Sequence, residues 1–179
     1  IRRFEVDFPR SVNDFNRFSN RLIQKKNEEI SLEENEEWMK QQGPYSSPLF
    51  DFIKNNKHKY DCFIFFTYLY ASTYFGLKEV YNKAWMVPTA HDEWPIYLPI
   101  FNELFSKPAG FIFNTIEERD FLRKQFSQFP LKGPVSGVGF NVPENTNPKR
   151  FRQQYDIFED FILYLGRIDP SKGCPILFD

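Results

Sequence analysis

Three ionisable residues in succession, His91, Asp92 and Glu93, follow an apolar stretch over residues 84–90. An imidazole beside two carboxylates could orient a substrate, move a proton or ligate a metal ion. We expect no metal ion here, because consecutive residues leaving a strand point to opposite sides and the sequence offers one further histidine, His58. The run favours substrate binding, with a core or surface histidine of no function as the alternative.

Two cations occur in the loop-forming segment GRIDPSKG, residues 166–173, directly after an apolar stretch. Backbone N–H groups of a tight loop, together with Arg167 and Lys172, could hold a diphosphate. The alternative is an exposed turn that carries two ordinary surface cations.

Other chemical motifs are incomplete. GVGFNV has Gly137 and Gly139, but a valine where a dinucleotide-binding loop needs its third glycine, so these glycines favour a turn or an interdomain connection. There is no G-x-S-x-G motif, and neither Cys62 nor Cys174 has a histidine at a recognisable spacing. The sequence therefore does not predict nucleophilic catalysis.

Composition excludes some classes of partner. With 23 basic and 24 acidic residues the formal net charge is -1, so no overall positive field would attract a nucleic acid. The two distant cysteines are expected to be packing residues in a reducing cytoplasm. The chain starts at Ile1 without a signal peptide or a membrane-spanning apolar run, so we expect an excised piece of a soluble protein.

The first third of the sequence has helical patterns. Apolar residues three and four apart predict a helix within residues 11–30. Ser31 and Glu34 form a capping box for a second helix that stops at Gly43, and Ser47 followed by proline predicts the start of a third.

From residue 60 onward, apolar runs alternate with helical segments, and Thr115 with Glu118 predicts a capping box for one of the helices. This alternation predicts an α/β fold, a Rossmann-like parallel sheet flanked by helices, with its ligand crevice at the carboxyl ends of the strands. His91 would then lie at that edge. The predicted strands are residues 60–66, 84–90, 110–115, 133–140 and 160–167.

GRIDPSKG resembles the G-R-x-x-x-x-K-G segment that opens the second domain of glycosyltransferase family four enzymes. VPTAHDE, FNTIEER and GVGFNVP are similar, in order and context, to the later part of that family's first domain, particularly in bacterial enzymes of surface polysaccharide biosynthesis. The resemblance runs from about Tyr60 to the end. It implies a two-domain GT-B architecture, with residues 1–143 as a partial N-terminal, acceptor-side domain and residues 144–179 as a linker and the first strand of the donor-side domain.

The resemblance also implies roles for the candidate residues. His91, the catalytic candidate, would orient the donor sugar, and the two loop cations would contact the donor diphosphate and offset the charge of the leaving nucleotide. The reaction would be the retaining transfer of a hexose from a nucleotide diphosphate sugar to a glycan or lipid-linked acceptor, without metal or cofactor. The substrate-binding candidates are Arg167, Lys172, Asp92, Glu93 and Gly139.

The chain departs from the family at both ends. The family begins with a strand and a glycine-rich loop near the acceptor site, and nothing before IRRFEV matches them. The family's pair of donor-binding glutamates does not appear before Asp179. We therefore expect the middle of a cytoplasmic enzyme, peripheral to the inner face of the membrane and without turnover on its own.

Two other functions are considered. A non-catalytic α/β module could bind a sugar or a partner through Tyr68, Tyr70 and Tyr74, although tyrosines at this spacing more often pack a helix onto a sheet. An epimerase acting on the same donors would need the complete dinucleotide fingerprint.

Overall fold

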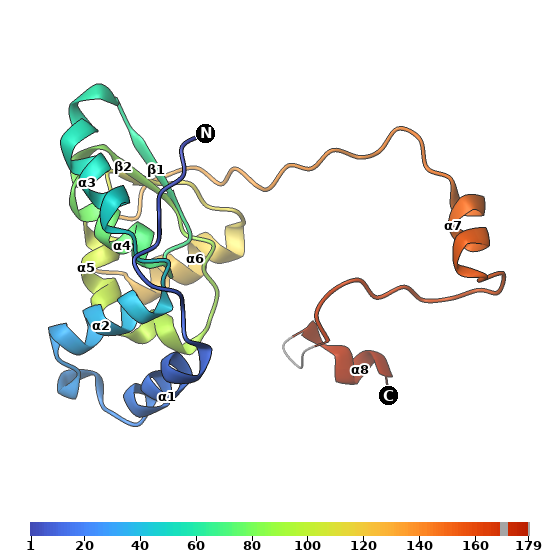
Figure 1. Ribbon diagram of the computed structural model, residues 1–179, viewed down its shortest axis with the longest axis horizontal. Coiled ribbons are helices and arrows are strands. Elements are labelled where there is room, and N and C mark those ends of the chain that lie inside the picture. Colours follow the sequence, from blue (N-terminus) through green and yellow to red (C-terminus); the bar gives the residue numbers. More distant parts are fainter. Residues whose placement is uncertain (169–171, 179) are drawn as a thin grey trace. The chain divides into compact units, whose positions relative to one another are not determined.

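The computed structural model describes residues 1–168 and 172–178 (Figure 1). The chain forms two compact units, Ile1–Gly139 and Phe140–Asp179, and each is described by itself. Among the described residues, no helix is both long enough and apolar enough to cross a lipid bilayer.

Three helices precede the sheet, and each begins at a serine cap. Ser31 and Glu34 form the predicted capping box, and the second helix ends at Gly43 as expected. The first helix lies within its predicted range and ends at Ile23. The third begins at Ser47 as predicted, and the residue before it, Ser46, is its cap. The bounds are α1 Val12–Ile23, α2 Leu32–Gln42 and α3 Ser47–Asn56.

A three-stranded parallel sheet follows, in the order β1-β2-β3 with β2 at its centre. Phe63 pairs with Ala84, and Trp85 pairs with Gly110. The strands lie where apolar runs predicted them, and the mixed α/β class with a helix-flanked parallel sheet is confirmed. The elements are β1 Phe63–Phe66, α4 Ala71–Lys78, β2 Ala84–Val87, α5 Ile100–Ser106, β3 Gly110–Phe111 and α6 Ile116–Gln125. Short 3-10 helices span Asn27–Glu29, Lys57–Lys59, Tyr81–Lys83 and Trp94–Tyr97.

A fourth segment runs beside β3 but forms little regular structure. The strand predicted over residues 133–140 is reduced to a single parallel bridge between Phe113 and Val135. Gly133 lies so close to the backbone of Phe111 that a Cβ atom on it would overlap the carbonyl group. Only glycine permits this close approach, which brings the segment alongside the sheet.

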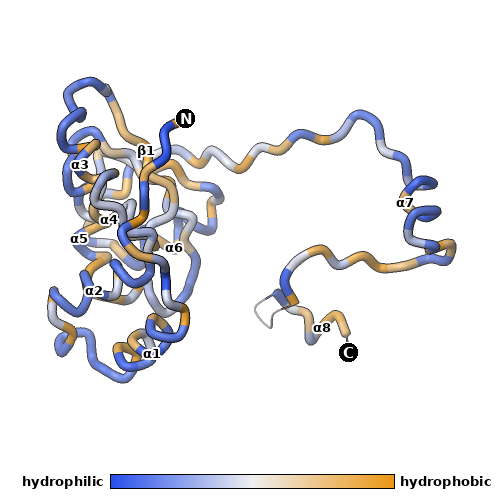
Figure 2. The backbone as a smooth tube through the Cα atoms, viewed as in Figure 1, coloured by the Kyte–Doolittle hydropathy of each residue, from blue (hydrophilic) through white to orange (hydrophobic). Residues whose placement is uncertain are grey.

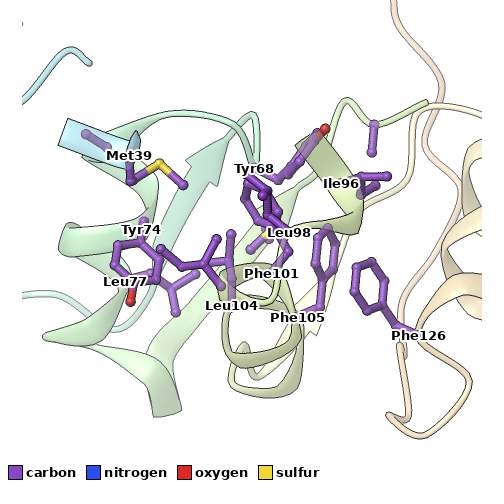
Figure 3. Close-up of a cluster of buried hydrophobic side chains, with 14 of the residues drawn as sticks. Met39, Tyr68, Tyr74, Leu77, Ile96, Leu98, Phe101, Leu104, Phe105 and Phe126 are labelled. Carbon is purple, nitrogen blue, oxygen red and sulfur yellow. The ribbon is translucent and has the colours of Figure 1, made fainter. Parts of the chain in front are cut away.

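The core of the first unit is largely aromatic (Figure 3). The rings of Phe105 and Phe126 stack 4.3 Å apart, and the Tyr68 ring lies 4.8 Å from that of Phe101. Tyr68 and Tyr74 are fully buried. The suggestion that Tyr68 and Tyr74 form part of a ligand-binding surface is therefore wrong, because their rings pack the elements together and cannot reach a ligand.

The described residues of the second unit form two helices, α7 Pro148–Tyr155 and α8 Cys174–Phe178. Figure 2 shows α7 as mainly hydrophilic and α8 as mainly hydrophobic. The strand predicted over residues 160–167 does not form in the described part of this unit. A strand needs a partner to satisfy its backbone groups, and the described residues of the unit contain none.

The cysteines differ in their environments. Cys174 is buried, as expected of a packing residue, but Cys62 is exposed. The expectation for Cys62 was wrong because the residue precedes β1 rather than lying within the apolar strand.

Candidate functional site

The candidate site lies at the carboxyl edge of the sheet, where the loops after β1, β2 and β3 meet. The backbone hydrogen bonding between β1 and β2 continues beyond the end of β1, because the N–H groups of Thr67 and Tyr68 donate to the carbonyls of Val87 and Pro88. This pairing holds the loop after β1 against the loop after β2, which carries His91. The edge position predicted for His91 is confirmed.

Glu93 lies between His91 and the core. The Tyr68 hydroxyl donates to Oε1 of Glu93 over 2.8 Å, and Oε2 of Glu93 lies 3.5 Å from Nε2 of His91. Burial, and then the neighbouring Glu93 carboxylate, raise the pKa of the Tyr68 phenol well above its usual range, so the hydroxyl keeps its proton.

The exposed imidazole could therefore contact a ligand while Glu93 orients it. The His91 side chain is 73% exposed, whereas that of Glu93 is 29% exposed. A carboxylate at this position limits the rotation of the imidazole. The arrangement can hold a hydroxyl or an anionic group by hydrogen bonding. Glu93 lies beside His91, an arrangement that the sequence did not predict, and its role in substrate binding remains a prediction.

Asp92 points elsewhere. Its Oδ1 accepts a hydrogen bond of 2.7 Å from the hydroxyl of Tyr97, and this bond raises the pKa of the Tyr97 phenol. The three-residue run therefore divides into a His91–Glu93 pair and a separate Asp92–Tyr97 pair. Within the part of the chain that the structure describes, no three potential metal ligands lie together.

Glu118 on α6 joins the loops after β2 and β3, and it is only 7% exposed. Its two carboxylate oxygens accept hydrogen bonds of 2.6 Å from the N–H groups of Ala90 and Asn114. The capping box predicted here is half correct. Thr115 does cap α6 by accepting the Glu118 N–H, but the Glu118 side chain bonds the loops instead of the cap residue. Ala90 immediately precedes His91, so Glu118 fixes the backbone at the start of the segment that carries His91, Asp92 and Glu93.

The edge also contains two threonines with left-handed backbone conformations. Thr67 follows β1 with φ 69°, and Thr89 follows β2 with φ 52°. Such conformations in β-branched residues cost roughly 1–3 kcal/mol and often occur at functional sites. The Oγ1 of Thr89 accepts a hydrogen bond of 3.4 Å from the side-chain amide of Asn114. No local sequence signal distinguished these threonines, because glycine is the usual residue at positive φ.

The remaining candidates lie apart from this edge in the sequence. Arg167 and Lys172 are exposed and belong to the second unit, and residues 169–171 between them lie outside the described residues. The Arg167 carbonyl accepts a hydrogen bond of 2.6 Å from the Tyr164 hydroxyl. Gly139 ends the first unit, with open space where a side chain would extend. The roles predicted for these residues remain predictions.

No known family model matches the chain, and comparisons with curated proteins and with solved structures likewise find no significant match. What the structure defines is an α/β domain with a polar site at the carboxyl edge of a parallel sheet.

Proposed function

We propose that the chain contributes to a retaining glycosyltransferase of GT-B architecture, which transfers a hexose from a nucleotide diphosphate sugar to a glycan or lipid-linked acceptor. The observation that carries this proposal is the exposed imidazole of His91 beyond the central strand β2, oriented by Glu93. Ligands of open α/β sheets bind at the carboxyl ends of the strands, so this position suits a group that contacts a substrate.

In this proposal His91 donates a hydrogen bond to a hydroxyl of the donor sugar. Glu93 holds the imidazole, and the buried Tyr68 hydroxyl holds Glu93, so the imidazole is oriented before the substrate arrives. Arg167 and Lys172 offset the negative charge that develops on the departing diphosphate. We propose that the reaction needs no metal and takes place in the cytoplasm, at the inner face of the membrane in surface polysaccharide biosynthesis.

The non-catalytic binding module has less support. Its tyrosine surface would require Tyr68 and Tyr74 to be accessible, and both are buried. An isolated sugar-binding role would also leave the oriented His91–Glu93 pair without a use.

The test compares paired variants of the full protein in two assays, calorimetric binding of a panel of nucleotide diphosphate sugars and transfer of radiolabelled hexose. Lys149→Ala with Arg150→Ala is the matched control for Arg167→Ala with Lys172→Ala, since all four cations are exposed and belong to the same unit. Loss of each loop cation should weaken donor binding about tenfold or more, because each would remove a hydrogen bond to a charged phosphate group.

His91→Ala should lower the transfer rate by about a hundredfold, the lower end of the usual effect of a positioned catalytic group, while donor affinity changes less. The proposed function is wrong if the double variant Arg167→Ala with Lys172→Ala and the variant His91→Ala both keep the transfer rate and the donor affinity of the unchanged protein.

A further inference from the structure

A groove lies between α1 and the loops at the carboxyl edge of the sheet. Its central cavity has a volume of about 280 Å³ and is lined by aromatic and amide side chains. The lining includes Asn16 and Asn20 from α1, Trp38 from α2 and Trp94 from the loop after β2.

The two tryptophans differ in what they can offer a ligand. Trp38 is fully buried, and its indole N–H donates a hydrogen bond of 2.9 Å to the Ser19 hydroxyl, so its polar group is already satisfied. Trp94 is 36% exposed and meets Trp38 at a steep interplanar angle of 77°, with ring centroids 5.7 Å apart. Among the described residues no ring stacks in parallel on Trp94, which leaves it able to stack on a ligand.

The polar groups of the groove are mostly uncharged. Asn16 and Asn20 lie one turn apart on α1, hence on the same helix face. Within the described residues, no hydrogen bond engages either side-chain amide, and both residues are exposed. The one charged residue of the cavity is Arg10, whose guanidinium lies over the Phe15 ring at 4.3 Å. Free amides beside an aromatic ring match the hydroxyls and the C–H face of a neutral sugar.

The groove adjoins the candidate site through neighbouring residues. Leu69 and Trp94 line the cavity, and they directly follow Tyr68 and Glu93, the two residues that orient His91. A sugar held against Trp94 would therefore lie beside the proposed transfer site.

The cavity also continues on both sides. It shares Arg10 and Gln42 with a cavity of about 460 Å³, and Ile23 and Trp94 with one of about 200 Å³. A row of three adjoining cavities suits an extended ligand better than a single sugar. The charged residues of the outer cavities include both signs, with Asp14 opposed to Lys40 in the larger one.

We propose that this groove binds a neutral oligosaccharide, the acceptor of the transfer reaction. The assignment as acceptor rests on the proposed function, but the binding itself does not. The test therefore measures binding in the absence of any nucleotide sugar.

The probes are hexasaccharides of β-linked glucose, α-linked glucose and N-acetylglucosamine, titrated by NMR into the complete chain. Trp94→Ala should weaken binding about tenfold, as expected for loss of a stacking aromatic ring. Asn16→Ala with Asn20→Ala, both exposed, should weaken binding to a similar degree through lost hydrogen bonds.

Two variants are matched controls. Asn13→Ala changes an exposed amide on the same helix that does not line the cavity, and Trp85→Phe changes a tryptophan of β2 outside it. Both should bind as the unchanged chain does. Circular dichroism shows whether every variant remains folded.

The proposal is overturned if none of the neutral hexasaccharides binds, or if Trp94→Ala and the Asn16/Asn20 pair bind as well as the controls. Tighter binding of an acidic oligogalacturonate of the same length would overturn the preference for a neutral ligand. Oligosaccharide binding by the chain, with no transfer from nucleotide sugars by the full protein, would instead refute the proposed function and leave the groove assignment standing.

Discussion

Replacing Glu118 by alanine should destabilise the first unit strongly, because this carboxylate is hydrogen-bonded to two loops and holds them together. Its side chain is nearly inaccessible, and its two oxygens each accept a backbone N–H at 2.6 Å, from Ala90 after β2 and Asn114 after β3. The alanine variant keeps the helix cap from Thr115, since that bond uses the backbone N–H of residue 118.

The magnitude follows from the two bonds. A hydrogen bond to a charged group contributes about 1.5–3 kcal/mol, so Glu118→Ala should cost about 3–6 kcal/mol of unfolding free energy. Total stabilities of small proteins are about 5–15 kcal/mol, so this is a large fraction. Glu118→Gln keeps one acceptor oxygen and turns an amide N–H₂ toward the other donor. That variant should cost about half as much.

Urea denaturation followed by circular dichroism measures these differences, with Glu117→Ala as the matched control. Glu117 is the exposed neighbour in the same first turn of α6, so its loss removes about 1 kcal/mol or less of favourable interaction with the helix dipole. Equal unfolding free energies for Glu118→Ala and Glu117→Ala would show that the carboxylate does not join the loops as described.

Two further predictions concern packing and pH. Gly133→Ala should destabilise the unit by about 1–3 kcal/mol because its Cβ would overlap the Phe111 backbone, whereas Gly139→Ala, with open space around it, should be neutral in the same urea titration. Partial burial opposes ionisation of Glu36, but the hydrogen bond and charge of Lys78 outweigh it and lower the carboxyl pKa below its ordinary value of 4.5. The unfolded chain then takes up the proton at higher pH, so this contribution is present above about pH 4.5 and lost as the pH falls through the lowered pKa. Lys78→Met should flatten the dependence of urea midpoint on pH in this acidic range, and an unchanged slope would argue against the ion pair.

Local sequence signals determined where most elements of the first unit begin and end. The Ser31–Glu34 capping box and Gly43 delimit α2 because the bonds concerned join residues within one turn. Apolar runs located β1, β2 and β3 because strands covered by helices must exclude polar residues. The placement of His91 at a carboxyl edge followed from the same alternation of strands and helices.

Only the tertiary structure decided which side chains meet at that edge. Tyr68 and Glu93 are 25 residues apart, and Glu118 and Ala90 are 28 apart, so no periodic pattern connects them. The pairing of β1 with β2 brings the first two together, and the packing of α6 brings the second two together. The strand predicted over residues 160–167 did not form, because an apolar run becomes a strand only when another segment supplies its hydrogen bonds. Local propensity selects the elements, but contacts between distant segments create the site.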